Sequence, residues 1–363
     1  MGWIGVSDQQ GGRFDAAGLA GAPGGDERRA APETIVPRGT LMIEARLSPE
    51  GRPQTLLAFR RSHPWSGNLS IQILPSGGIT LIETLGDDIR HATLKHDLDS
   101  SADLVRISYR WDAPARWGKL TLEHLGTSRI LSVDVPMAHP MLLADLRMII
   151  RSPAQRRVDR DVAFLAVSDM IEPIGPTPGL TAQVPVATPR GAVPVSALRR
   201  GDTVYTSDGD IVPVLQTVRQ CVPAYGSFRP VRLRAPYFGL YQDILVAPQQ
   251  RLVMAGSQVE YMFGTEAVLV PARHLVNRMS ALVADGPDLV TYHDLLLPGH
   301  EAIVTAGCPM ESLYIGRLRR KPDDLAASVL RGVDRNRLPE HARPIWPVLK
   351  PFEAITLALH RAA

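Results

Sequence analysis

The sequence is poor in cysteine and lysine, and it has no long apolar stretch. Its 363 residues include 2 Cys and 4 Lys. So few cysteines exclude a disulfide framework as the basis of the fold; Cys221 and Cys308 either pair with each other or remain as two small buried thiols. No run of about 18 apolar residues occurs, so we predict no membrane-spanning helix. The opening, MGWIGVSDQQGGRFD, lacks a basic start and an apolar core, so we expect no cleavable secretory signal.

Charged and metal-binding residues are not grouped as nucleic-acid or metal sites require. Lys and Arg together number 40 against 37 Asp and Glu, and the basic runs at 156–157 and 317–321 are short. A nucleic-acid partner usually requires a basic stripe, so we predict none. The 10 His and 2 Cys show no CxxC or HExxH spacing, and no glycine-rich phosphate loop follows a strand. We therefore predict neither a metal nor a cofactor.

The composition is that of a β-rich protein with more than one hydrophobic core. There are 31 Pro and 30 Gly, and 45% of the residues are hydrophobic. Such a composition favours many short strands joined by turns. A length of 363 residues predicts two domains rather than one. We therefore predict an all-β fold, with helices confined mainly to the region beyond residue 320.

Apolar residues alternate with polar ones over much of the first half, which is the period of a half-buried strand. The alternation is clear at Leu41, Ile43 and Ala45, at Leu69, Ile71 and Ile73, and at Val105, Ile107, Tyr109 and Trp111. Because no helical pattern intervenes, we predict an antiparallel jelly-roll-like β-sandwich over residues 39–170. Residues 1–38 are predicted as a flexible lead-in, with docking of Trp3-Ile4 on a domain as the alternative for its start. We further predict a proline-rich linker over 171–178, a second β domain over 179–320 and a C-terminal extension over 321–363.

The most specific pattern is GLTAQVPVATPRGAVPVSALRRGDTVYTSDGD, which begins at Gly179. Turn signals at 188–191, 200–202 and 208–209 divide it into short strands. This block resembles the opening of hedgehog/intein (Hint) domains, whose usual form is CFTPGTxIATPRGxxPVExLRxGDxVxTxDG. The resemblance implies a Hint-type β-barrel over residues 179–320.

Two later segments extend the resemblance in the same order. Residues 271–276 (PARHLV) resemble the family's VPAKHLV. His300-Glu301, together with Glu311-Ser312, resembles the family's ending, HEVI…GLPSES. These ordered matches span the whole of the predicted second domain.

The first domain resembles the concanavalin/laminin-G-type sandwiches that often accompany Hint domains in bacterial proteins. That resemblance implies a lectin-like domain with a carbohydrate or protein ligand. Trp65 and Trp117 lie in or beside predicted loops, where two exposed indoles would form a platform for a sugar. The alternative is that both are partly buried loop residues, with Trp111 in the core.

Hint domains rearrange their own backbone. In the family, a thiol or hydroxyl at the first residue attacks the preceding carbonyl, a His assists at the scissile amide, and hydrogen-bond donors stabilise the oxyanion. Here Gly179 stands where the family has its nucleophilic Cys, and Gln250 stands where it has the His. Glycine has no side chain, and a glutamine amide does not titrate near neutral pH. The positions that fall on the family's catalytic segments, called here the family positions, are Gly179, Thr181, Ala247, Gln250, Asp294, His300 and Glu301.

The remaining family positions offer only partial substitutes. Thr181 is the nearest hydroxyl, but it corresponds to a family Thr that does not attack. Asp294 replaces the first His of the family's YxHLxFDxHE, whereas His300 and Glu301 survive. His300 is either a base or a hydrogen-bonded structural residue.

Two functions of different classes follow. The first is a non-catalytic Hint-fold protein that binds or scaffolds. The alternative is a self-cleaving enzyme that still cuts between Pro178 and Gly179. In either case the family geometry predicts that Gly179 and Gln250 lie close together in the folded domain, with Asp294 or His300 nearby.

Overall fold

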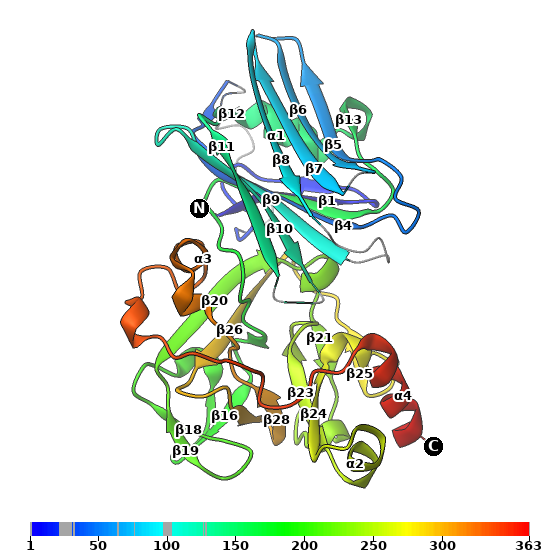
Figure 1. The fold of residues 1–363 in the computed structure, drawn as a ribbon, viewed down its shortest axis with the longest axis vertical. Coiled ribbons are helices and arrows are strands. Elements are labelled where there is room, and N and C mark those ends of the chain that lie inside the picture. Colours follow the sequence, from blue (N-terminus) through cyan, green and yellow to red (C-terminus); the bar gives the residue numbers. More distant parts are fainter. Residues whose placement is uncertain are drawn as a thin grey trace. The chain divides into compact units, whose positions relative to one another are not determined.

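The computed structural model describes residues 2–21, 31, 33–63, 65–75, 77–96, 104–125, 127 and 129–362, with side chains described through Leu357. The chain divides into two compact units, Met1–Pro173 and Ile174–Ala363. The boundary between them falls inside the segment predicted as a linker. Both units are built mainly from short antiparallel strands (Figure 1).

The first unit contains two antiparallel sheets. The seven-stranded sheet has the order β11 (Ile130–Pro136), β10 (Trp117–His124), β9 (Leu104–Asp112), β4 (Arg38–Arg46), β14 (Val162–Ser168), β1 (Trp3–Asp8) and β2 (Gly12–Phe14). The five-stranded sheet has the order β13 (Arg156–Arg157), β5 (Gln54–Arg61), β6 (Gly67–Leu74), β7 (Gly78–Leu85) and β8 (Asp88–Lys95). A further pair joins β12 (Met141–Leu142) to β3 (Ile35–Val36).

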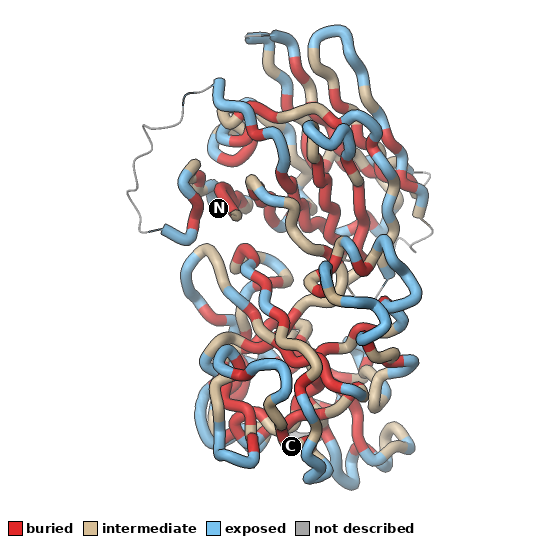
Figure 2. Tube along the Cα trace, turned by 90° about the vertical axis from the view of Figure 1, so that its left-hand side faces the viewer, coloured by how far each residue is buried: buried red, intermediate tan, exposed pale blue. Residues whose placement is uncertain are grey.

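The core of this unit is built from the strands that the sequence predicted. The alternating apolar residues of β4, β6 and β9 belong to one buried cluster, in which Ile43, Ile71 and Ile107 are each 0% exposed. Figure 2 colours the buried residues of the chain red. Helix α1 (Leu143–Arg151) buries Leu146 and Ile149 in the same cluster. The prediction of an all-β, jelly-roll-like sandwich is confirmed.

The prediction of a flexible lead-in over residues 1–38 is wrong for its two ends. Strand β1 lies between β14 and β2 in the large sheet, and β3 pairs with β12. Trp3 and Ile4 are 3% and 1% exposed. The short apolar segment WIGV is ordered because it pairs with a strand some 160 residues away, a contact that local sequence cannot reveal. Residues 22–30 of the predicted lead-in lie outside the described residues.

The second unit contains two six-stranded sheets. The first has the order β20 (Gln216–Pro223), β26 (Leu289–Leu296), β15 (Leu180–Thr181), β22 (Ile244–Val246), β21 (Val231–Leu233) and β25 (Ala281–Val283). The second has the order β17 (Gly191–Pro194), β16 (Pro185–Thr188), β27 (Ala302–Thr305), β28 (Cys308–Glu311), β23 (Arg251–Ala255) and β24 (Ala267–Pro271). Strands β18 (Thr203–Tyr205) and β19 (Ile211–Pro213) form a separate hairpin.

The helices of the second unit are short. They are α2 (Ser257–Phe263), α3 (Pro322–Ala327) and α4 (Pro351–Ala362). Across both units, single turns of 3-10 helix cover Pro153–Gln155, Val195–Ala197, Gly226–Phe228, Tyr237–Gly239, Ala272–His274, Leu318–Arg320 and Arg335–Arg337. Within the described residues, no helix is both long and apolar enough to cross a bilayer.

The C-terminal extension is part of the packed second unit. Leu325 and Leu330 join Leu296 of β26 in one buried cluster. Further along, the backbone N–H of Leu269 in β24 donates to the carbonyl of Pro347 at 2.8 Å, and Leu349 N–H donates back to Leu269 at 3.0 Å. The extension therefore lines β24 before it enters α4.

The two cysteines are not joined. Cys308 on β28 is buried and Cys221 on β20 is exposed, and no disulfide links them. Pairing is therefore wrong, and the description as a small buried thiol holds for Cys308 alone. Burial raises the pKa of Cys308 to about 12, which makes it a poor nucleophile.

The position of β1 inside the sheet gives a direct test with two isoleucines. Replacing Ile4, which is 1% exposed, with alanine removes buried apolar surface, so Ile4→Ala should lower the free energy of unfolding by about 2–5 kcal/mol. Ile35→Ala is the matched control, because Ile35 is 55% exposed, and it should change stability by less than about 0.5 kcal/mol. Denaturant unfolding measures both. Equally small losses of unfolding free energy for both variants would contradict the burial of β1 and would indicate a flexible N-terminal segment.

Candidate functional site

The strand order of the second unit explains why distant family positions meet. The two-residue strand β15 lies between β22 and β26, because Leu180 pairs with Val246 on one side and with His293 on the other. Gly179, just before β15, therefore lies beside Ala247, just after β22, on one side and beside Asp294 of β26 on the other. Residues that are far apart in the sequence are brought to one point by these pairings.

Gly179 and Gln250 are in contact, as predicted. A Cβ atom built on Gly179 would lie 1.8 Å from Oε1 of Gln250 and 3.0 Å from its Cβ. The Gln250 side chain is held there, since its Nε2 donates to the carbonyl of Glu311 at 3.0 Å, and the residue is only 3% exposed. The amide of Gln250 thus fills the space into which a side chain at position 179 would project.

Backbone hydrogen bonds tie the same segment together. The N–H of Ala247 donates to the carbonyl of Gly179 at 2.7 Å, and the N–H of Gln250 donates to the carbonyl of Ala247 at 3.0 Å. Ala247 is fully buried. Ala247 has a methyl group where the family has a hydroxyl. Its hydrogen bonds to Gly179 and Gln250 are therefore made by the backbone.

Asp294 is the buried acid of the site. Its carboxyl accepts the backbone N–H of Leu295 at 2.8 Å, and the N–H groups of Gly179 and Leu313 are near enough to lower its pKa, although the Leu313 N–H itself donates to the carbonyl of Leu295 at 3.0 Å. The residue is 3% exposed. Burial raises its pKa well above the usual value; the charge of Glu311 acts in the same direction, and the three amides act against it. Asp294 therefore lies beside the nitrogen of the Pro178–Gly179 peptide.

His300 is held between the C-terminal extension and Glu311. Its Nδ1 accepts the backbone N–H of Ile345 at 2.9 Å, so the neutral ring carries its proton on Nε2. That Nε2 lies 3.3 Å from Oε2 of Glu311, at ion-pair distance but without hydrogen-bond geometry. Arg251 contacts the same carboxylate at 3.0 Å. Glu311 therefore links His300 to Gln250, because its carboxylate faces His300 and its backbone carbonyl accepts the Gln250 amide.

The other surviving family positions make structural bonds. The Thr181 hydroxyl donates to the carbonyl of Leu245 at 2.8 Å. The backbone N–H of Glu301 donates to the hydroxyl of Ser312 at 3.2 Å, and Ser312 N–H returns a bond to the Glu301 carbonyl at 2.8 Å. The hydroxyl nearest the scissile peptide is thus already committed to the backbone.

Sequence reasoning missed the residues that surround His300. Glu311 and Arg251 lay inside recognised segments, yet nothing marked them as an ion pair. No sequence motif pointed to His341, because it lies in the C-terminal extension. Its ring centroid lies 5.8 Å from that of His300. Burial lowers the pKa of His341 to about 4, with His300 adding to the effect. Within the described ranges, no group of three or more His, Cys, Asp or Glu is placed to hold a metal ion.

The two indoles proposed as a sugar platform lie on different sheets. Trp65 follows β5 in the small sheet, and Trp117 begins β10 in the large one. They are 44% and 39% exposed. One face of Trp65 is covered by the guanidinium of Arg61, whose Cζ lies 5.1 Å from the ring centroid. Trp111 is fully buried and donates to the carbonyl of Val36 at 3.1 Å, so it is a core residue.

Asp294 should contribute strongly to folding. Asp294→Ala leaves the buried backbone N–H of Leu295 without its side-chain acceptor, and an unsatisfied buried group costs about 1–3 kcal/mol. We expect a loss of unfolding free energy of about that size. Asp294→Asn keeps a side-chain oxygen and should cost less. Asp208→Ala, in an exposed turn, is the control and should be nearly neutral.

The pH dependence of these variants has a defined sign. The folded-state pKa of Asp294 is raised, so its contribution to stability is present at low pH and is lost as pH rises through that folded-state value. The stability of the wild type relative to Asp294→Asn should therefore fall as pH increases. Denaturant unfolding at a series of pH values measures it, and the opposite slope would show that the three amides outweigh burial.

Comparison with known proteins agrees with this arrangement. The Hint domain family model matches residues 178–317. Among solved structures, the MchDnaB-1 intein is 16% identical over 36% of this chain and 98% of that chain, with a TM-score of 0.24. The CBM40 module of Ruminococcus gnavus IT-sialidase, bound to alpha2,3 sialyllactose, is 12% identical over 36% of this chain and 62% of that chain, with a TM-score of 0.23. Domains LG4-5 of the mouse laminin alpha1 chain are 7% identical over 79% of this chain and 73% of that chain, with a TM-score of 0.23.

No curated protein matches the chain. Because all three TM-scores are below 0.5, the family match carries the assignment. The chain contains a Hint domain over residues 178–317, preceded by a β-sandwich.

Proposed function

We propose that this chain is a Hint-fold protein that no longer processes itself and acts by binding. The observation that carries the proposal is the contact between Gly179 and Gln250. Position 179 has no side chain, and the amide of Gln250 occupies the space where a nucleophile would project. The Hint domain then serves as a folded support, and the sandwich is the unit that binds a carbohydrate or protein ligand.

The chemistry of the site supports this proposal. An acyl shift needs an attacking side chain and a group that delivers a proton to the departing amide. Gly179 cannot attack, and the hydroxyl of Thr181 is bonded to the carbonyl of Leu245. Gln250 has no proton to deliver, and its amide is bonded to Glu311.

One observation favours the alternative, residual cleavage between Pro178 and Gly179. The N–H of that peptide lies near the Asp294 carboxyl, and burial keeps that carboxyl protonated well above its usual range. A carboxylic acid beside the departing nitrogen is one part of a cleavage site. The Pro178–Gly179 junction has no attacking side chain, so any cleavage there would depend on water or an added nucleophile.

Intact-mass measurement of the purified chain separates the two functions. Incubation with hydroxylamine or a thiol should leave the full-length mass unchanged over days, because no ester or thioester forms for the added nucleophile to open. Appearance of a fragment that ends at Pro178 would establish the self-cleaving alternative. A chain unfolded in denaturant and incubated in parallel controls for nonspecific cleavage.

A variant series tests which group is missing. Gly179→Cys alone should stay intact, because its Cβ collides with Gln250 and position 250 lacks the His that would assist the departing amide. General acid–base assistance is worth about 10² to 10⁴ in rate, so Gly179→Cys combined with Gln250→His should show thiol-induced cleavage after Pro178. Gly179→Ala combined with Gln250→His is the matched control, because it adds the same Cβ without a nucleophile.

The outcomes of this series are distinct. Efficient cleavage by Gly179→Cys alone would show that another group supplies the proton, with Asp294 the first candidate, and would contradict the role given to Gln250. Cleavage of the alanine control would show that no side-chain nucleophile is needed. Thermal melting of each variant establishes that the domain is folded before its mass is followed.

A further inference from the structure

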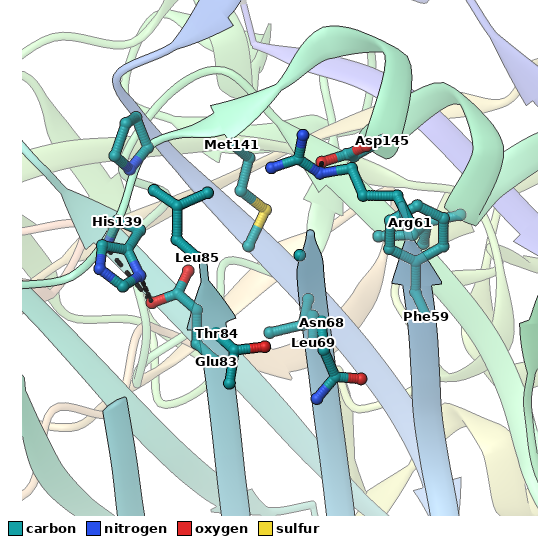
Figure 3. A pocket seen from close by; sticks show the side chains of 13 residues that line it. Phe59, Arg61, Asn68, Leu69, Glu83, Thr84, Leu85, His139, Met141 and Asp145 are labelled. Atoms are coloured by element: carbon teal, nitrogen blue, oxygen red, sulfur yellow. Dashed lines mark hydrogen bonds and ion pairs between the residues drawn. The ribbon is translucent and has the colours of Figure 1, made fainter. Parts of the chain in front are cut away.

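A pocket in the sandwich unit lies between the small sheet and the segment that leads into α1 (Figure 3). Its empty space is about 380 Å³, a figure that includes the solvent at its open mouth. Strands β5, β6 and β7 form one side, and residues 139–149 form the other. Apolar lining comes from Phe59, Leu69, Leu85 and Met141.

Two pairs of charged side chains face each other across this pocket (Figure 3). On one side Nε of Arg61 lies 2.9 Å from Oδ2 of Asp145, and these side chains are 8% and 12% exposed. On the other side Nδ1 of His139 lies 3.5 Å from Oε2 of Glu83, and these are 12% and 6% exposed. Charged groups are seldom buried inside a β-sandwich without a specific use.

The first pair is incompletely satisfied. Nη1 of Arg61 and Oδ1 of Asp145 are buried and have no hydrogen-bond partner in the described protein. In the second pair, Glu83 accepts the hydroxyl of Tyr109 at 3.1 Å and the backbone N–H of His139 at 3.3 Å, and Nδ1 of His139 is buried without a hydrogen-bond partner in the described protein. Leaving a buried donor and a buried acceptor unpaired is costly, so the side of the pocket at Arg61 is built to meet another molecule.

Two neighbouring residues, Gly67 and Trp65, lie against the guanidinium of Arg61. A Cβ atom on Gly67 would lie 2.7 Å from Nε of Arg61 and 3.1 Å from Cζ, so an alanine at position 67 would require the guanidinium to shift. Trp65 packs on the guanidinium from the loop, with Cζ 5.1 Å from its ring centroid. The indole thus orients Arg61, which is a different role from stacking directly on a sugar.

The free atoms define the chemistry of the ligand. Nη1 of Arg61 needs an acceptor and Oδ1 of Asp145 needs a donor, and a hydroxyl group provides both. Both basic side chains of the lining, Arg61 and His139, already face carboxylates. An anionic ligand would therefore meet Asp145 and Glu83 without an uncommitted cation among the lining residues.

We propose that this pocket binds a small neutral polyhydroxylated ligand, a single sugar ring or a free polyol, whose neighbouring hydroxyls bridge Nη1 of Arg61 and Oδ1 of Asp145. The apolar lining contacts the C–H groups of the ligand. The inference deepens the binding role proposed for the sandwich and rests on it. It names a site built around Arg61 in place of a platform of Trp65 and Trp117.

The test uses the full chain and defined probes. Burial raises the pKa of Asp145 to about 6, so titrations at about pH 7.5 keep the carboxyl mostly ionised. Calorimetry and saturation-transfer NMR are run with the methyl glycosides of glucose, galactose and mannose, with glycerol, and with N-acetylneuraminic acid. At least one neutral probe should bind saturably. Stronger binding by a glycoside identifies a sugar ring, and equal binding by glycerol identifies a free polyol.

Two glycine variants give a matched comparison. Gly67→Ala displaces the guanidinium of Arg61 and should weaken binding of the best neutral probe by at least about tenfold. Gly78→Ala, in the same sheet, places its Cβ at an ordinary 3.5 Å from Thr93 and should leave binding unchanged. Asp145→Asn, which keeps the side-chain shape, should also weaken binding.

Three outcomes would overturn the proposal. They are the absence of saturable binding by every neutral probe, tighter binding by N-acetylneuraminic acid than by the neutral probes, and equal affinities for wild type, Gly67→Ala and folded Asp145→Asn. Thermal melting establishes that each variant is folded. None of these outcomes bears on self-cleavage, so the hydroxylamine experiment continues to test the proposed loss of processing separately.

Discussion

The hydrogen bonding of the Asp294 carboxyl organises the start of the Hint domain. This buried side chain accepts the backbone N–H of Leu295 in β26, and the N–H groups of Gly179, before β15, and Leu313, after β28, are near enough to lower its pKa. Gln250, which precedes β23 in the other sheet, contacts the same residue, Gly179. Its side-chain oxygen packs against Gly179, and its side-chain nitrogen donates to the carbonyl of Glu311. With these contacts in place the first residue of the domain is buried and fixed. Gly179 presents only hydrogen at this point, and the amide of Gln250 fills the space beside it.

The C-terminal extension contributes to this site as well. Ile345 donates its backbone N–H to His300, and His341 lies beside the same ring. These residues lie beyond the 178–317 span of the family match. An imidazole whose Nδ1 accepts a backbone N–H and whose Nε2 faces Glu311 is held in one orientation, which suits a structural residue better than a mobile proton carrier.

The parts that the sequence could predict were those with a local or motif signal. Period-two alternation located β4, β6 and β9, and the ordered family motifs brought Gly179 to Gln250. Strand β1 was missed because its four apolar residues are too few to stand out, and its partner β14 lies at the far end of the unit. The three amides near Asp294 and the pairing of Arg61 with Asp145 depend on strand register and tertiary packing, which no local pattern encodes.

The central claim is that Gly179 is locked in a closed site by Asp294 and Gln250, and amide hydrogen exchange observed by NMR tests it most directly. A hydrogen-bonded, buried N–H exchanges only when the surrounding structure opens. Because Gly179 is buried beside Asp294 and the N–H of Leu295 donates to its carboxyl, the amides of Gly179 and Leu295 should exchange as slowly as those of the central strands, and Asp294→Ala should accelerate both. Exchange of the Gly179 amide at the rate of an exposed loop would contradict the account, because it would mean that the peptide after Pro178 is open to water.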